Sequence, residues 1–153
     1  MASPRMTEDE VWSFVAGAHT GILTTLRRDG MPISMPLWFA CIDRVVYLST
    51  RGKKLARIAR DPRASFLVET GAAWADLKAV HLTGRADVID PEPGLLALVE
   101  AETTRKYDTF RTPAEHMPPA AAEVYARSMR WVRFVPDTRV LQWDNSKLVG
   151  GTR

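Results

Sequence analysis

Basic side chains gather around one glycine, between a short apolar run and a helical pattern. The run VVYLS at 45–49 is followed by Arg51, Gly52 and the pair Lys53 and Lys54. A helix start presents unpaired N–H groups and a partial positive charge, and glycine lets a ligand approach the backbone. With two ammonium groups added, this turn predicts a phosphate-binding site. One alternative is an ordinary solvated helix face. A nucleic-acid-binding surface is a more remote alternative, because the basic residues form no long stripe or tail.

The other residue types that carry chemistry form no group. His19, His81 and His116 fall in different predicted elements and lack the spacing of metal ligands. The sequence contains no Walker motif, no Gly-x-Gly-x-x-Gly and no Gly-x-Ser-x-Gly. The one cysteine, Cys41, cannot form an internal disulfide, which is typical of a reducing cytoplasm. We therefore predict no metal site and assign no catalytic residue.

Aromatic side chains mark two of the predicted strands. Trp38 and Phe39 follow Pro36, and Trp143 ends the last strand. Tryptophans in a small domain usually belong to the core or to a dimer interface, whereas a planar ligand stacked on the indole is the sharper alternative. Proline cannot donate to a ladder, so Pro36 predicts an edge, a bulge or a ligand on that side of its strand.

Length and composition indicate one domain that spans residues 1–153. Apolar residues make up 46% and charged residues 25% of the chain, and the net charge is +3. No apolar run approaches the roughly 20 residues that cross a bilayer, and the N-terminus lacks the apolar stretch of a signal peptide. We expect a soluble, cytoplasmic protein with a small-molecule substrate and with neither nucleic acid nor membrane as a partner.

Hydrophobic periodicity and turn signals supply the elements that position these residues. A capping box, Thr7 to Glu10, opens a predicted helix over 7–18. Further helices are expected after Gly52, from 91 to 107 and over 120–128, and the tail 147–153 is expected to fray. Gly84 suggests a bulge, and Pro136-Asp137 a turn. Strands are predicted at 20–27, 33–42, 45–49, 64–70, 77–89, 129–135 and 138–143, which favours an α+β domain built on an antiparallel barrel.

Three segments resemble the pyridoxamine 5′-phosphate oxidase-like superfamily of flavin-binding split β-barrels. They are GILTTLRRDGMPISMPLWFAC, LSTRGKKLARIARDPRASFLVE and VLQWDNSKL, which occur in the order of the family between Thr20 and Leu148. The resemblance implies a six-stranded antiparallel split β-barrel with flanking helices. It also implies a homodimer that holds two equivalent cofactor sites at the subunit interface.

The resemblance also implies a set of cofactor-binding residues. Two lysines match the family's contacts to the cofactor phosphate, and two hydroxyl side chains lie beside them. Four residues belong to the strand that runs along the cofactor ring, and the remaining residues contribute positive charge or an indole ring. These residues are Met35, Pro36, Leu37, Trp38, Ser49, Thr50, Lys53, Lys54, Arg57, Trp143 and Lys147.

The end of the chain departs from the pattern of true pyridoxamine phosphate oxidases. The family's Arg-Leu-His, which holds the vitamin substrate, corresponds here to Lys147-Leu148-Val149. Lysine lacks the bidentate fork of arginine, and valine forms no side-chain hydrogen bond. The resemblance therefore implies an oxidoreductase of the short branch, which uses FMN or the deazaflavin coenzyme F-420 for hydride transfer. The alternatives are a non-catalytic cofactor carrier or sensor, and a haem-binding split barrel in which His116 would be a candidate ligand.

Overall fold

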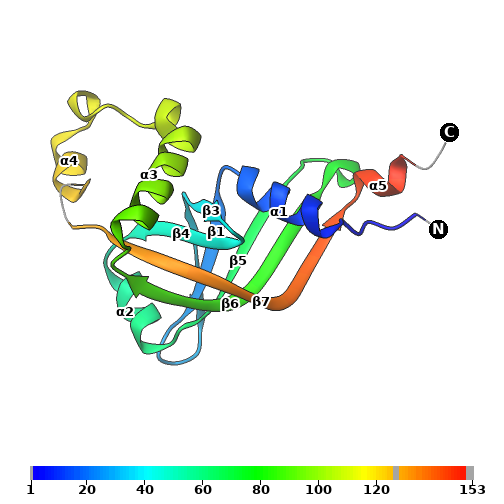
Figure 1. The fold of residues 1–153 in the computed structure, drawn as a ribbon, viewed down its shortest axis with the longest axis horizontal. Coiled ribbons are helices and arrows are strands. Elements are labelled where there is room, and N and C mark those ends of the chain that lie inside the picture. Colours follow the sequence, from blue (N-terminus) through cyan, green and yellow to red (C-terminus); the bar gives the residue numbers. More distant parts are fainter. Residues whose placement is uncertain (1, 126–127, 151–153) are drawn as a thin grey trace.

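One curled antiparallel sheet forms the body of the molecule (Figure 1). The computed structural model describes residues 2–125 and 128–150. In this part of the chain the sheet has seven strands in the order β2-β1-β5-β6-β7-β4-β3. The strands are β1 (Gly21–Leu26), β2 (Pro32–Leu37), β3 (Ala40–Ile42), β4 (Val45–Thr50), β5 (Arg63–Thr70), β6 (Lys78–Ile89) and β7 (Arg130–Asp144). The predicted α+β split barrel is confirmed, with seven strands in place of six.

Helices cover the open side and the two ends of this sheet. α1 (Glu8–Gly17) starts at the predicted capping box, in which the Thr7 hydroxyl accepts from the Glu10 N–H and the Glu10 carboxylate accepts from the Thr7 N–H. The other helices are α2 (Lys53–Arg60), α3 (Pro93–Tyr107), α4 (Pro119–Tyr125) and α5 (Ser146–Val149), with 3₁₀ turns η1 (Trp74–Asp76), η2 (Asp108–Phe110) and η3 (Ala114–His116). None of the described helices has the length and apolar character that a membrane span requires.

The main core lies inside the curl of the sheet. Leu23 of β1, Phe66 of β5 and Phe134 of β7 are buried there, and α1 closes it with Val11 and Val15. A smaller cluster lies on the other face of the sheet, where β3 and β4 pack against α3 through Ala40, Tyr47 and Val99. Alternation along β4 therefore sends one set of its side chains to the barrel core and the other to α3.

The predicted strand over 33–42 divides into β2 and β3. Trp38 and Phe39 separate them, because the backbone of Phe39 is bonded to α3 and not to a neighbouring strand. Its N–H donates to the Tyr107 hydroxyl, and its carbonyl accepts from Lys106 Nζ, both at 3.0 Å. Pro36 lies in β2, which is a terminal strand of the sheet, so the predicted edge position is confirmed.

The prediction of two final strands with a turn at Pro136 is wrong. β7 continues through Pro136 from 130 to 144 and bends there, opposite Gly84. The pairing register with β6 shifts between Leu82 and Gly84, which confirms the predicted bulge. Between the pairs Gly84–Pro136 and Leu82–Val140, three residues of β7 stand opposite one residue of β6, so the strand bends after the proline and then resumes its pairing.

The C-terminal tail is more ordered than predicted. Residues 146–149 form the one-turn helix α5, whose first residue, Ser146, donates from its N–H and its hydroxyl to Asp144. Positions 151–153 of the predicted frayed tail lie outside the described residues. The helix predicted over 120–128 is α4, which ends at Tyr125, and positions 126–127 of that prediction also lie outside them.

The bend in β7 predicts a sharp sensitivity at Gly84. A Cβ at this position would lie 2.2 Å from the carbonyl oxygen of Val135 and 2.8 Å from Pro136 Cα. We expect Gly84→Ala to lower the free energy of unfolding by about 1–3 kcal/mol, because backbone atoms must move apart. Urea denaturation measures the change. Gly94→Ala is the control, since a Cβ there meets no atom within 4 Å, and equal losses in both variants would contradict the account.

Candidate functional site

The predicted phosphate-binding turn is the β4–α2 corner, which we define as Ser49, Arg51, Gly52, Lys53 and Lys54. Gly52 caps α2 with φ 74°, a conformation that favours glycine, and no side chain caps the first N–H groups of the helix. A Cβ on Gly52 would meet no atom within 4 Å, so the backbone is open to a ligand. The first turn of α2 holds no acidic residue. The corner therefore keeps its positive charge uncompensated by its own helix.

Arg51, which belongs to the basic turn of the sequence, adds a third cation to Lys53 and Lys54. Its Nη1 atom is buried and has no hydrogen-bond partner among the described residues. Its guanidinium carbon lies 5.3 Å from the centroid of the Tyr125 ring in α4. A buried donor without an acceptor is costly, and a small rotation of the Arg51 side chain toward an anion at the corner would relieve that cost. No sequence pattern distinguishes this arginine from its exposed neighbours.

Two predicted contacts point away from the corner. Thr50 is only 3% exposed, on the core side of β4. Arg57 donates from Nε to the Thr25 hydroxyl at 3.0 Å, which ties α2 to β1. Arg57 therefore ties α2 to β1 and Thr50 belongs to the core side of β4, whereas Ser49 and Lys54 stay accessible at the corner.

A cavity of about 720 Å³ adjoins the corner. It lies between the outer face of β4 and β7 and the α3–β7 segment, by which we mean residues 108–125 and 128–129. Ser49 and Trp38, two of the predicted cofactor residues, line it together. The other aromatic residues of the lining are Phe39, Tyr47, Phe110, Tyr125 and Trp131, and no aspartate or glutamate lines the cavity among the described residues.

Trp38 forms a flat wall of this cavity because α3 holds it there. Its indole stacks on the Tyr107 ring with centroids 4.5 Å apart and planes 4° apart. Tyr107 is fully buried, and its hydroxyl lies 2.8 Å from the carbonyl oxygen of His19 and 3.0 Å from that of Phe39. No local pattern singles out Tyr107, since it ends an ordinary helix 69 positions after the tryptophan that it supports.

Lys106 reinforces the same junction. Its Nζ donates to the Phe39 carbonyl at 3.0 Å and lies 3.7 Å from the centroid of the Phe39 ring. Burial lowers the pKa of Lys106 to about 8. The adjacent Glu102 is paired with Arg105 at 2.6 Å. Burial likewise raises the pKa of the nearby Cys41 thiol, to about 11.

β2 presents the strand that was predicted to run along a cofactor ring. It is an edge strand, so one side of its backbone has no strand neighbour among the described residues. Met35 and Pro36 are exposed, but the Leu37 side chain packs against the main core. Of the four predicted residues, Leu37 can therefore face a ligand only with its backbone.

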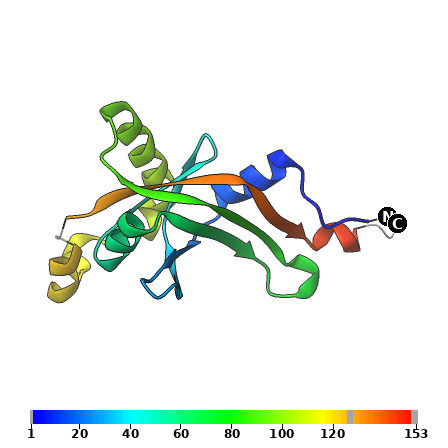
Figure 2. The ribbon, with the colours of Figure 1, turned by 90° about the horizontal axis from the view of Figure 1, so that it is seen from below.

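Trp143 and Lys147 lie at the other end of the protomer. Figures 1 and 2 both show α5 beside the chain termini, and α2, α3 and α4 at the opposite end. Lys147 Nζ is paired with the Glu10 carboxylate of α1 at 2.6 Å, and Trp143 is 40% exposed. The structure does not bring these two predicted residues to the β4–α2 corner of the same chain.

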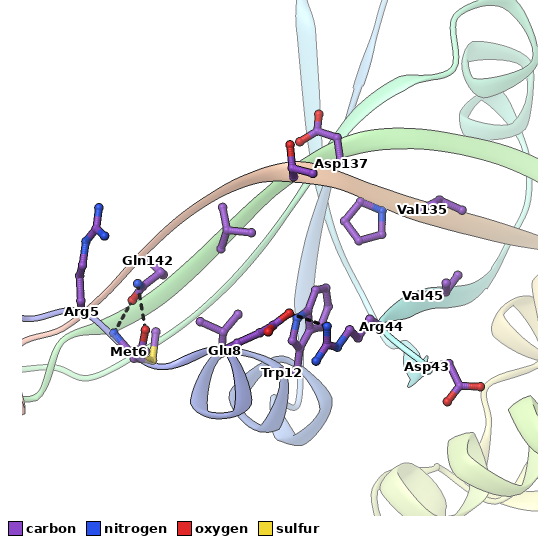
Figure 3. Close-up of a pocket in the computed structure, with 14 residues that line it drawn as sticks. Arg5, Met6, Glu8, Trp12, Asp43, Arg44, Val45, Val135, Asp137 and Gln142 are labelled. Carbon is purple, nitrogen blue, oxygen red and sulfur yellow. Dashed lines mark hydrogen bonds and ion pairs between the residues drawn. The ribbon is translucent and has the colours of Figure 1, made fainter.

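A second cavity, of about 630 Å³, contains none of the predicted site residues (Figure 3). It lies between α1, the β3–β4 turn and the bend of β7. Glu8 and Arg44 are paired across it at 2.5 Å, and the Gln142 amide bonds to the backbone of Met6. These partners satisfy each other, so this cavity is a weaker candidate. No cluster of three histidine, cysteine or acidic residues suited to a metal ion occurs in the described chain.

Comparison with known proteins identifies the fold of this site. A family model described as pyridoxamine 5′-phosphate oxidase matches residues 7–136. A conserved hypothetical protein of Mycobacterium tuberculosis is 31% identical with a TM-score of 0.78, and the match covers 100% of this chain and 93% of the other. No curated protein matches the sequence.

Two more distant structures share the fold. One is a FAD-binding protein of Mesorhizobium loti, which is 19% identical with a TM-score of 0.67 over 90% of this chain and 94% of that one. The other is a heme storage protein of Vibrio cholerae, which is 12% identical with a TM-score of 0.66 over 93% and 99%. At these identities the likeness concerns architecture alone.

The environment of Lys106 predicts a pH-dependent stability. Its folded-state pKa of about 8 lies below the ordinary value of 10.5, so between these values the unfolded chain binds more protons than the folded one. Stability from this group therefore rises with pH above about 8. Relative to Lys106→Met, the wild type should gain at most about 1 kcal/mol in free energy of unfolding from pH 7 to pH 9. Urea denaturation at both pH values tests this, and a difference that does not change with pH would contradict it.

Proposed function

Because the chain belongs to the pyridoxamine 5′-phosphate oxidase family, we propose that it binds a phosphorylated flavin-type cofactor at the β4–α2 corner. The cofactor is FMN or coenzyme F-420, and the protein is an oxidoreductase that uses it on a small organic substrate. The observation that carries this proposal is the buried Nη1 of Arg51, which lacks an acceptor among the described residues beside an uncapped helix start. A phosphate would supply that acceptor.

The charges of the corner suit a phosphate better than a neutral ligand. Lys53 and Lys54 open α2, whose own first turn has no carboxylate to neutralise them. The open N–H groups of the helix add hydrogen-bond donors and a favourable dipole. Ser49 offers a hydroxyl on the same side of β4 as Arg51, because alternate residues share a face. This set of donors fits the terminal phosphate of either cofactor.

Side chains and backbone near the corner also suit a planar ring. The free edge of β2 offers backbone donors and acceptors, and the indole of Trp38 is held rigidly by its stack on Tyr107. Hydride transfer is chemistry that the bound cofactor supplies, and the protein contributes orientation and electrostatics. Such a division of labour explains why no acid–base pair stands out among the cavity residues. It does not identify the proton donor.

We also infer a homodimer, in which each site takes residues from both copies. Trp143 and Lys147 match cofactor contacts of the family, but they belong to the end of β7 and to α5, and α5 lies at the opposite end of the chain from α2 (Figure 1). On one face of the outer part of β7, Leu141 and Trp143 are 66% and 40% exposed. Exposed apolar side chains grouped on a strand are typical of an interface. A second copy packed on this strand would cover them and bring Trp143 and Lys147 toward its partner's corner.

Two rival functions use the same fold. A cofactor carrier or sensor would bind flavin or deazaflavin without turnover, and steady-state assays with candidate acceptors separate it from an enzyme. A haem-binding protein would need an axial ligand, and His116, on the exposed turn η3, is a candidate with no positioning contact among the described residues. An absorbance spectrum of the purified protein distinguishes flavin, deazaflavin and haem.

Titration of the apoprotein with FMN and with F-420 tests the cofactor site. Quenching of tryptophan fluorescence should report binding, because Trp38 and Trp131 line the adjacent cavity. We expect Arg51→Gln to weaken binding by about 1.5–3 kcal/mol, the scale of a hydrogen bond to a charged group, and Lys54→Ala to weaken it by about 1–3 kcal/mol. Arg28→Gln, at an exposed arginine of the β1–β2 turn, removes the same charge and should have little effect. Failure of the wild type to bind either cofactor would refute the proposal.

Sedimentation analysis tests the homodimer. We expect Leu141→Glu to shift the protein toward the 17.1 kDa monomer, because a carboxylate cannot be buried in an apolar interface without a partner. Cofactor affinity should fall in the same variant, since each site would lose the partner's residues. Leu98→Glu, at a leucine of α3 that is 59% exposed, is the matched control. A wild type that sediments as a monomer would contradict the inference.

A further inference from the structure

The α3–β7 segment encloses a cavity that shares only Ser49 with the β4–α2 corner. Figure 1 shows this segment beside α3, at the same end of the molecule as α2. It contributes Phe110, Met117, Ala121 and Tyr125 to the cavity wall, opposite Trp131 of β7. Its described part contains only short helical turns and the seven-residue α4, so its side chains, and not a regular packed layer, define the walls.

The lining of the cavity selects one chemical class. Flat aromatic walls and two methionines, Met117 and Met129, favour an apolar planar molecule, since aromatic rings stack and methionine adapts to irregular shapes. The volume of about 720 Å³ lies in the range of small-molecule sites. Arg111 is the charged residue among the lining, and no carboxylate accompanies it, so a cation is disfavoured.

Two contacts tie this cavity to the cofactor site. Tyr125, in its wall, stacks with the Arg51 guanidinium of the corner at 5.3 Å. Trp38 lines the cavity and follows directly on the edge strand β2. A molecule in the cavity would therefore lie next to a ring held along β2, and it would meet the phosphate site only at Ser49, which belongs to both.

On these grounds we propose that the cavity is the substrate pocket, and that the substrate is a planar, largely apolar molecule without a positive charge. That the bound molecule is a substrate rests on the proposed function. The pocket and its selectivity for planar, apolar molecules rest on the lining residues alone. α4 is then the specificity element, because Ala121 leaves the space that a larger side chain would fill.

Ala121 and Ala120 offer a matched pair of variants. Ala121 lines the cavity and is half-buried, whereas its neighbour Ala120 is exposed and does not line it. The probe is N-phenyl-1-naphthylamine, an uncharged, apolar aromatic fluorophore with a flat naphthyl ring, added to the full-length protein with and without saturating FMN or F-420. We expect binding to the wild type in both conditions, a loss of affinity of about tenfold or more in Ala121→Trp, and little change in Ala120→Trp. Met117→Glu, which adds a carboxylate to the apolar wall, should also weaken binding, so the test does not depend on one variant.

The outcomes separate the possible errors. No binding of the probe to the wild type, or equal losses in Ala120→Trp and Ala121→Trp, would overturn the pocket. Displacement of the probe by FMN or F-420, or a parallel loss of cofactor affinity in Ala121→Trp, would assign the cavity to the cofactor and overturn its role for a substrate. Tighter binding of the planar cation thioflavin T than of the neutral probe would overturn the charge selectivity. A wild type that binds the probe but neither cofactor refutes the proposed function and leaves the pocket standing.

Discussion

The course of β7 is the constraint on which the rest of the structure depends. The strand pairs with β6 over 131–144 but with β4 only over 130–134, and it bends at Pro136 where Gly84 leaves room. Because of this bend the sheet curls around its core. The second half of β7 then leaves β4 and carries Trp143 and Lys147 to the far end (Figure 1). One bulge thus separates residues that the family pattern groups in one site.

The junction with α3 gives the candidate site its rigidity. Tyr107 and Lys106 bond to the backbone of Phe39 and interrupt what would otherwise be one continuous strand. The price of this interruption is a shortened ladder, and the result is an indole fixed at the cavity wall by stacking on a buried ring. A site that must hold a planar molecule benefits from a wall whose rotamer is set by packing.

Charges of opposite sign lie at the starts of two helices, α2 and α1. Cations without acidic partners in their own helix open α2, whereas the carboxylates Glu8, Asp9 and Glu10 open α1 at the other end. These two helix starts differ in how their charges interact with the helix dipole. Acidic residues at a helix start stabilise the helix, and lysines there oppose its dipole. The unfavourable arrangement at α2 is what an anion would relieve, which is why the corner stands out from the other basic surfaces.

Local signals in the sequence determined much of this protein. The capping box of α1, the edge position of Pro36, the bulge at Gly84 and the basic turn at Gly52 were all predictable, because each depends on residues close together in the chain. The order of the three segments that resemble the family predicted the split-barrel fold. Tertiary structure alone decided that Pro136 bends a strand and does not end it, that Thr50 and Arg57 face inward, and that Arg51 keeps a buried atom unpaired. These outcomes depend on contacts between distant segments, such as Gly84 with Val135 or Arg51 with Tyr125, and no local pattern encodes which partner a side chain will meet.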